Sequence, residues 1–262
     1  MGVTPDASIA ERFNDLLQHE NPRESLFQSF LEKYPEFLLT PFLLNHHVHG
    51  SALISQFRLG TTLTADFAYL TKSSIKWRLV LVEIERPNID LFLSNNDQIT
   101  PTAAFNKRIA QIHEWMSEVR RNSGPIFRAL DSLRRPAEKN AIDVRYLLIV
   151  GRSAQSFKNQ RYADRLLDLG GNDLQISTFD SLSRHYSSGQ AEKKNILALR
   201  KGIVHFKYLH VPPSQMLAHM YPHELSLTVP QANRLRSWGY DIPAWKSGRL
   251  LSINGKKASQ RD

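Results

Sequence analysis

The sequence predicts an α/β protein with one mixed central sheet flanked by helices. Short apolar runs typical of strands alternate with longer segments whose apolar residues recur at the 3.6-residue period of a helix. The predicted order is helix, three strands, helix, strand, helix, strand. The three consecutive strands have short connections, which favours an antiparallel meander inside the larger sheet.

Composition limits the class of protein. The chain has 262 residues, of which 41% are hydrophobic and 10% aromatic, enough for one large domain with a small appendage. The absence of cysteine excludes disulfides and thiolate metal sites. No secretory signal pattern and no run of about 18 apolar residues is visible, so we expect a cytoplasmic protein without a membrane segment.

Two helices are predicted at the start of the chain. Residues 8–19 carry apolar side chains at helical spacing, with Ser8 as the expected N-cap. The Asn-Pro dipeptide at 21–22 opens a second helix with Glu24 in its first turn, and Pro35 ends or kinks that helix.

Changes in the spacing of apolar residues along the sequence predict the strands and the later helices. Residues 54–59, 63–70 and 76–85 have strand patterns, with a turn at 71–74. A long amphipathic helix is predicted over 103–122, and it stops at Gly124 and Pro125. A buried strand over 144–152 and a helix over 158–171 follow. Residues 174–186 are predicted to form a strand and then a helix that opens at Asp180.

The charge distribution divides the chain. Residues 193–262 hold twelve basic and three acidic residues, whereas residues 1–192 are balanced, so the whole excess of +9 lies near the C-terminus. This asymmetry indicates a polyanionic partner, although a solvated basic tail would have the same composition. We therefore predict three parts: an N-terminal helical extension over 1–21, a main domain over 22–190 and a small basic C-terminal region over 191–262.

An unusual pair of acids marks the third predicted strand. Glu83 lies inside the apolar run and Glu85 follows two residues later, so both side chains share one face of a strand. Asp66 lies on the preceding antiparallel strand, and a suitable register brings the three carboxylates together. Clustered carboxylates repel one another unless a cation intervenes, and hard oxygen ligands suit Mg²⁺ or Mn²⁺. Solvated acids at strand ends are the alternative.

The ordered motifs resemble a known family. Asp66, followed after sixteen residues by Glu83-x-Glu85 on a meander and then by a long helix, is similar to the PD-(D/E)xK nuclease superfamily, which has a restriction-endonuclease-like fold. Over roughly residues 22–190 the chain resembles the nuclease domain of Shedu antiphage defence proteins more closely. The stretches that carry this likeness are "FLEKYPEFLL" (30–39), "ADFAYL" (65–70), "LVLVEIERPNIDLF" (79–92), the helix bearing Gln111, "YLLIVGR" (146–152) and "ISTFDSL" (176–182).

The resemblance implies a metal-dependent nuclease site. Asp66 and Glu83 correspond to the metal ligands, with Mg²⁺ or Mn²⁺ as cofactor, and Gln111 stands on the following helix in a spacing like Gln-x-x-x-Tyr. Glu85 occupies the place of the usual lysine, where an acid cannot supply positive charge. Glu85 is then a general base or an extra ligand, or the site is degenerate. An acid from the first helix, Glu36 or Glu32, joins many sites of this superfamily.

Several basic residues are candidates for DNA contact. Arg86 follows the Glu-x-Glu pair and either forms a salt bridge or reaches phosphate. In the C-terminal region basic residues alternate with rings that either stack on bases or pack the region against the core. The candidate DNA-binding residues there are Arg234, Arg236, Lys246 and Arg249, interleaved with Trp238, Tyr240 and Trp245, and the histidines 205, 210, 219 and 223 lack paired metal-ligand spacing.

Three functions are compatible with these features. The resemblance implies an antiphage endonuclease that nicks or cuts invading DNA and assembles as a homo-oligomer. A catalytically degenerate nuclease-fold module that binds DNA or another partner is the main alternative, because of the Glu-x-Glu pattern. A regulator whose segment 225–251 is a helix-turn-helix is the third.

Overall fold

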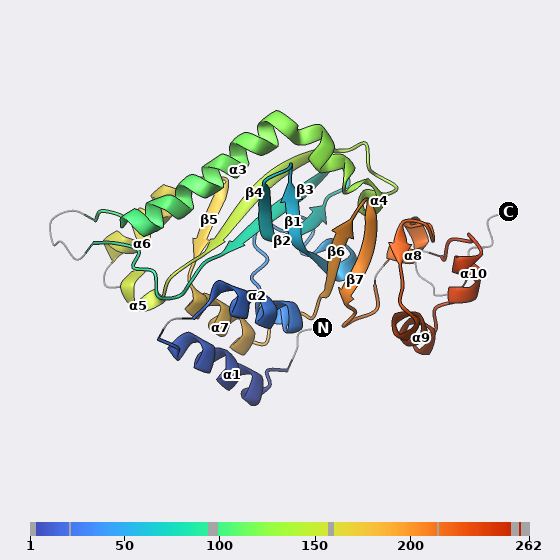
Figure 1. Cartoon of the computed structure of the whole chain (residues 1–262), viewed down its shortest axis with the longest axis horizontal. Helices are drawn as coiled ribbons and strands as arrows, with labels where there is room; N and C mark the ends of the chain where they lie inside the picture. Colours follow the sequence, from blue (N-terminus) through green and yellow to red (C-terminus); the bar gives the residue numbers. More distant parts are fainter. Residues whose placement is uncertain are drawn as a thin grey trace.

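The structure is a computed structural model that describes residues 4–20, 22–93, 99–156, 160–213, 215–252 and 257; of residues 155 and 156 it describes the backbone alone. One eight-stranded sheet forms its centre, in the order β5-β4-β3-β2-β1-β6-β7-β8 (Figure 1). The strands are β1 (Ala52–Leu59), β2 (Leu63–Lys72), β3 (Lys76–Ile84), β4 (Ala141–Ile149), β5 (Leu174–Ser177), β6 (Asn195–Arg200), β7 (Ile203–Tyr208) and β8 (Leu225–Ser226).

The sheet is mixed, as the sequence predicts. β1 pairs antiparallel with β2 and β2 pairs antiparallel with β3, which confirms the meander. β6 and β7 are also antiparallel, whereas β3–β4, β4–β5, β1–β6 and β7–β8 are parallel pairs. Because β4 and β5 each return through a helix, the parallel half of the sheet needs helices on its faces.

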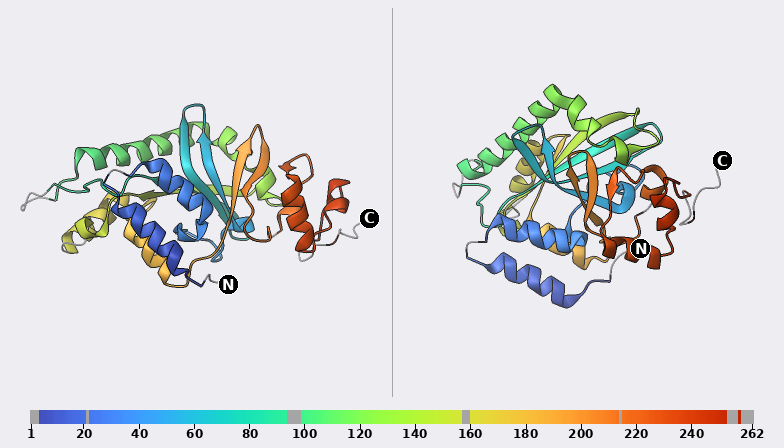
Figure 2. Two further views of the ribbon diagram at one scale, coloured as in Figure 1. Left: turned by 60° about the horizontal axis from the view of Figure 1, so that its bottom comes forward. Right: turned by 45° about the vertical axis from the view of Figure 1, so that its right-hand side comes forward.

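Helices cover both faces. The long helix α3 runs along one face, and α1, α2 and α7 lie together on the other (Figures 1 and 2). The helices are α1 (Ala7–Gln18), α2 (Glu24–Lys33), α3 (Ala103–Arg128), α4 (Asp131–Arg134), α5 (Ser153–Ser156), α6 (Gln160–Gly170), α7 (Phe179–Ser187), α8 (Met216–His219), α9 (Val229–Ser237) and α10 (Ile242–Lys246), with the short 3₁₀ turns η1 (Pro35–Phe37) and η2 (His49–Ser51).

Each face of the sheet has its own apolar core. Along β2 the side chains alternate, so that Phe67 and Tyr69 enter the core beneath α1, α2 and α7 while Ala68 and Leu70 enter the core beneath α3. This period of two is the expected result of a strand buried on both sides. It explains why the strand sequences are apolar almost throughout.

Four predicted helix boundaries need correction. Helix α2 begins at Glu24 with Arg23 as its N-cap, and Asn21 of the predicted Asn-Pro start lies outside the described residues. The N-cap of α1 is Asp6, whose carboxylate accepts a hydrogen bond from the Ser8 backbone N–H, so Ser8 is the second helical residue. Helix α7 starts after Thr178 rather than at Asp180. Helix α3 does not stop at Gly124 and Pro125: the chain bends at Asn122, whose backbone is not helical, and continues to Arg128. The bend accommodates the proline, which cannot donate a backbone hydrogen bond.

The region after residue 190 contributes to the main sheet. β6 pairs in parallel with β1 through Ala52–Ile54, and β7 and β8 follow it outward. Helices α8, α9 and α10 lie beyond this end of the sheet (Figure 1). Trp245 on α10 is 1% exposed, and its indole N–H donates to the Met220 carbonyl oxygen at 2.8 Å. The basic region is therefore partly structural.

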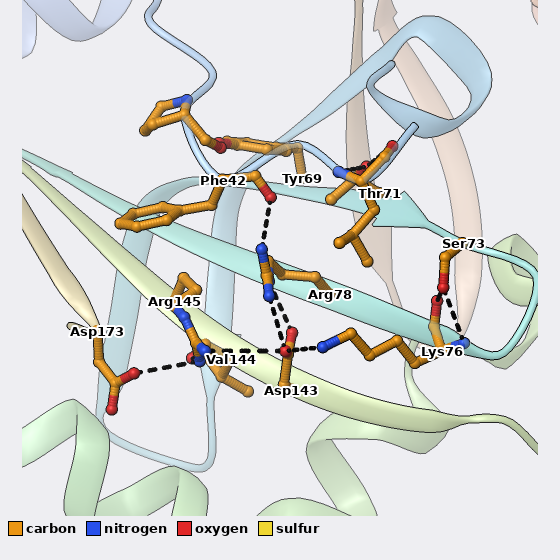
Figure 3. A network of polar contacts seen from close by, with 12 residues as sticks. Phe42, Tyr69, Thr71, Ser73, Lys76, Arg78, Asp143, Val144, Arg145 and Asp173 are labelled. Atoms are coloured by element: carbon orange, nitrogen blue, oxygen red, sulfur yellow. Dashed lines mark hydrogen bonds and ion pairs between the residues drawn. The ribbon is translucent and has the colours of Figure 1, made fainter. Parts of the chain in front are cut away.

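A charged network fastens β3 to β4 (Figure 3). Asp143 on β4 accepts hydrogen bonds from Arg78 Nε at 2.8 Å and from Lys76 Nζ at 3.0 Å. Arg78 Nη1 also donates to the Phe42 carbonyl oxygen at 3.0 Å, which attaches the loop before β1. Burial opposes the charge of Asp143, but the hydrogen bonds from Arg78 and Lys76 outweigh it and hold the pKa of Asp143 below its ordinary value.

Among the helices of the described residues, none combines the length and the apolar character needed to cross a membrane.

Candidate active site

Asp66 and Glu83 lie opposite each other on neighbouring strands. The antiparallel register pairs Phe67 with Val82, so one further step along the two strands brings Asp66 across from Glu83. Side chains directly opposite in an antiparallel pair point to the same face of the sheet. The adjacent positions Ala68 and Leu81 belong to the core beneath α3, which places both acids on the α3 side. Asp66 is 8% exposed and Glu83 6% exposed.

The Asp66 carboxylate closes the end of the β2–β3 ladder. Its Oδ2 accepts a hydrogen bond from the Ile84 backbone N–H at 2.8 Å, and its Oδ1 accepts one from Gln56 Nε2 at 3.0 Å. Gln56 stands inside β1 with a φ of 51°, a left-handed conformation that costs a residue with a side chain about 1–3 kcal/mol. Surrounding packing therefore holds Gln56 in a strained backbone conformation that aims its amide at Asp66.

Helix α3 supplies the partner of Glu83. Gln111 Nε2 donates to Glu83 Oε1 at 2.5 Å, so this glutamine contacts the acidic cluster directly. Trp115, one helical turn later, is fully buried in the core beneath α3. Its packing fixes the rotation of the helix and hence the direction of the Gln111 side chain.

A second side chain of α3 reaches Glu85. Arg108 Nη1 lies 2.6 Å from Glu85 Oε1 and also donates to Gln111 Oε1 at 3.3 Å. Glu85 follows directly after β3, and its backbone N–H donates to the Ile149 carbonyl oxygen at 2.8 Å, so it continues the pairing of β3 with β4. Arg108 thus places a guanidinium charge beside the acid that stands where the Glu-x-Lys pattern has lysine.

The carboxylates destabilise one another's charged forms. Burial is the largest cause that raises the pKa of Glu83, and the charges of Asp66 and Glu85 raise it further. Burial also raises the pKa of Asp66, again with help from neighbouring acids. For Glu85, burial outweighs the attraction of Arg108 and raises the pKa to about 7. A bound cation would remove this mutual repulsion.

A fourth acid near the cluster comes from α2. The charge of Glu24, in the first turn of α2, raises the pKa of Asp66, Glu83 and Glu85. Sequence reasoning expects an acid from this part of the chain but assigns Glu36 or Glu32, and no property of the sequence distinguishes Glu24 from other solvated helix acids.

The two acids expected at the site have other surroundings. Glu32 is buried and ion-paired with Lys207 at 2.5 Å, and it accepts a hydrogen bond from Ser55. Gln28 Nε2 lies 3.1 Å from Glu32 Oε1 and 3.3 Å from the Asp66 carbonyl oxygen, so α2 is nevertheless attached to the strand that carries Asp66. Glu36 is buried in η1, and its charge acts on Lys194 and His210.

The carboxylate oxygens of the cluster suit a hard divalent cation that takes only one or two ligands from the protein. Mg²⁺ retains several waters and is commonly bound through one or two carboxylates, which Asp66 and Glu83 provide. Among the described residues there is no group of three or more acidic or histidine side chains arranged to hold a metal. The expected convergence of three carboxylates on one ion is therefore not present, and Glu85 is instead ion-paired with Arg108.

The candidate DNA-contacting residues are exposed but dispersed. Arg86 is exposed at the end of β3, next to the acidic cluster. Arg234, Arg236, Lys246 and Arg249 are exposed on and after α9 and α10, in a different part of the chain.

The aromatic residues of the same segment mostly pack. Trp245 is buried, and Trp238 and Tyr240 are partly buried against the core. Arg234 lies over the Trp238 ring, 4.9 Å from its centroid. The segment predicted as a helix-turn-helix contains the nine-residue α9 and the five-residue α10. Of the four histidines, His210 stacks on Tyr208 and His223 on Tyr221.

These features define an α/β protein whose mixed sheet carries a buried, paired-carboxylate centre facing one long helix. The family model of the Shedu protein SduA C-terminal region matches residues 21–183, more than half of the chain, and the protein belongs to this family. Family membership suggests a role in antiphage defence. None of the curated proteins compared with the chain matches it.

Proposed function

We propose that the protein is a metal-dependent DNA endonuclease that nicks or cuts invading DNA. The observation that carries this proposal is the pair Asp66 and Glu83, buried opposite each other on neighbouring strands with raised pKa values. Two such carboxylates suit a divalent cation, and a bound cation can activate water and neutralise the charge that develops during phosphodiester hydrolysis. Membership of the Shedu family agrees with this use of the site.

Each residue of the cluster has a defined role in the proposed reaction. Asp66 and Glu83 would hold Mg²⁺ or Mn²⁺, which supplies Lewis acidity and a water of lowered pKa when bound. Gln111 orients Glu83 through its hydrogen bond. Glu85 accepts a proton from the attacking water at a carboxylate oxygen, and Arg108 beside it supplies the positive charge that the missing lysine would give.

The basic surface serves the substrate. Arg86, exposed beside the cluster, contacts the phosphate backbone near the cut, and Arg234, Arg236, Lys246 and Arg249 hold more distant phosphates. Such contacts fix DNA without reading its sequence, which suits an enzyme acting on foreign DNA of any sequence. We also propose a cytoplasmic homo-oligomer, and sedimentation of the chain as a monomer at micromolar concentration would contradict the oligomer.

The test is cleavage of supercoiled plasmid with Mg²⁺ or Mn²⁺. We compare the wild type with Glu83→Gln, which removes one ligand charge, and with Glu114→Gln, which changes an exposed acid of α3. Glu83→Gln keeps the fold because a neutral side chain of equal size suits the buried position. Cleavage by the wild type and by Glu114→Gln, and its loss in Glu83→Gln and in EDTA, is the expected result. Equal cleavage by Glu83→Gln excludes this site.

A second function is favoured by one observation. Glu85 occupies the position of the usual lysine and forms an ion pair with Arg108, which neutralises the charge of that arginine. A centre neutralised in this way is what we expect of a nuclease fold that binds DNA without cutting it. Such a module retains plasmid with a steep dependence on salt but leaves it intact with either metal. Plasmid binding without nicking by the wild type therefore favours this alternative over the endonuclease.

A further inference from the structure

A second polar centre lies at the other end of the same sheet. A cavity of about 360 Å³ adjoins Lys72, the last residue of β2, and residues just before the starts of β1 and β6. Lys72 lies six residue steps along β2 from Asp66, about 20 Å at the rise of a β-strand. The cavity is therefore separate from the candidate active site.

Lysines dominate the charge of this cavity. Lys72, Lys193 and Lys194 line it together with a single acid, Glu192, so the charged lining residues have a net charge of +2. His49 also lines the cavity, but burial and the nearby Lys72 lower its pKa to about 4, so it is neutral at neutral pH. His47 lines the cavity as well, and the fixed positive charge there comes from the three lysine amino groups.

Lys194 is the most unusual of these residues, because it is 3% exposed. Its ammonium donates to the backbone carbonyl oxygen of Glu192 at 3.0 Å, and within the described part of the chain it has no ion pair with a carboxylate. Glu192 and Glu36 act on it from a longer range, and burial lowers its pKa to about 8. A buried ammonium without a close counter-ion is costly, and an anion in the cavity would offset that cost.

The backbone around the cavity is also strained. Three lining residues that are not glycine, Asn45, Ser51 and Gln215, have φ values of 53°, 49° and 61°. Left-handed conformations of this kind persist where the surrounding structure imposes them, and they cluster at places that hold ligands. Two of them lie in the stretch before β1 and the third lies just before α8, and their occurrence around one cavity fits a preformed binding place.

We propose that this cavity binds a small phosphomonoester. Its volume lies in the range of cavities that hold small ligands. A phosphate monoester carries a charge of about −1.5 to −2 near neutral pH, which matches the net charge of the lining, and lysine ammonium groups bind phosphate as point charges. A carboxylate, with one negative charge, leaves part of the lining charge uncompensated.

The test is calorimetric titration of the full chain with ribose 5-phosphate in a buffer that contains EDTA, so that the outcome is independent of metal-dependent cleavage. Unphosphorylated ribose and inorganic phosphate are separate arms. A short DNA carrying a 5′-phosphate, compared with its 5′-hydroxyl form, distinguishes a nucleic-acid end from a free phosphate ester. The variants are Lys194→Met, Lys193→Gln and the control Lys201→Gln, an exposed lysine of the β6–β7 turn.

We expect saturable binding of ribose 5-phosphate, no binding of ribose, at least about tenfold weaker binding in Lys194→Met and Lys193→Gln, and wild-type affinity in Lys201→Gln. Binding of the phosphorylated DNA without binding of ribose 5-phosphate overturns the proposal in favour of a nucleic-acid end. Absence of binding of every phosphate by the wild type overturns the proposal. The proposal is also overturned if Lys193→Gln and Lys201→Gln lose affinity equally, because that result indicates general attraction to a basic surface. Because Lys193 is exposed, we expect Lys193→Gln to fold, so it still tests the proposal if Lys194→Met fails to fold.

Discussion

Arg108 and Glu85 form an ion pair of 2.6 Å between the long helix and the end of β3. Glu85 stands where the Glu-x-Lys pattern of the sequence resemblance has its lysine, so the positive charge of this centre comes from the helix rather than from the strand. The guanidinium also contacts Gln111, which in turn contacts Glu83. The three side chains connect both acids of the Glu-x-Glu motif to one face of α3.

Removing the charge of Arg108 tests this arrangement. We expect Arg108→Gln to lower the rate of plasmid nicking by about 10²-fold, because one positively charged donor near the developing phosphate charge is lost. Arg108→Lys keeps a cation on the helix and leaves Glu85 in place, so we expect it to retain a substantial part of the rate. Nicking rates measured under saturating Mn²⁺ provide the comparison, and an unchanged rate in Arg108→Gln assigns the pair a purely structural role.

Metal binding has a consequence for stability. A cation that binds only the folded state raises the unfolding midpoint in proportion to the logarithm of its concentration. We expect Mn²⁺ to raise the midpoint of the wild type and to leave that of the Asp66→Asn, Glu83→Gln double variant unchanged, as followed by circular dichroism. A similar rise in both proteins would place the ion elsewhere.

The exposed basic residues on α9 are expected to contribute to DNA affinity without affecting the chemistry. Each phosphate contact contributes about 0.9 to the slope of log affinity against log salt concentration for duplex DNA. Arg234→Gln combined with Arg236→Gln should therefore lower the slope by about 1–2. Binding isotherms at several salt concentrations measure this slope, with Lys201→Gln as an exposed control from the same region. An unchanged slope removes α9 from the DNA interface.

The Asp143 network predicts a pH effect on stability. The folded-state pKa of Asp143 lies below its unfolded value, so its contribution is complete above the unfolded value, near 3.8, and is lost as the pH falls through the folded value. We expect Asp143→Asn to lower the free energy of unfolding by about 1–3 kcal/mol at neutral pH. Denaturant titrations should show this difference shrinking below pH 3.8. A difference that persists into strong acid would point to packing rather than charge.

Much of the fold was predictable because its signals are local. The period of two along 54–59, 63–70 and 76–85 identifies the meander, and antiparallel pairing with short turns then allows only a few registers. The observed register, one of the few that such a meander allows, places Asp66 opposite Glu83. Gln111 was singled out by the family resemblance rather than by helix periodicity.

The partners that complete the centre were not predictable from spacing. Arg108 meets Glu85, and Gln56 meets Asp66, only because α3 packs across the sheet and β1 bends at a left-handed residue. Glu24 acts from another helix, 42 to 61 residues away in sequence from the acids that it influences. Such contacts depend on tertiary packing, which hydrophobic periodicity does not specify.

The strands after residue 190 were missed for a related reason. β8 has two residues, and β6 and β7 mix apolar with basic side chains, so their alternation is weak. The strand that pairs with β6 in the main sheet, β1, precedes it by more than 130 residues. A helix stop at Gly124 and Pro125 was expected for local reasons, but packing of Ile126 into the core carries α3 onward.

The parallel pairing of β6 with β1 determines how the protein can be divided. The family match ends at residue 183, yet Ala52–Ile54 lose their hydrogen-bonded neighbour if the chain is cut at that point. An apolar strand whose edge is suddenly bare recruits strands from other molecules. A truncated fragment should therefore accumulate as insoluble aggregates. The segment beyond the matched region protects the edge of β1 and so prevents the sheet from pairing with other molecules.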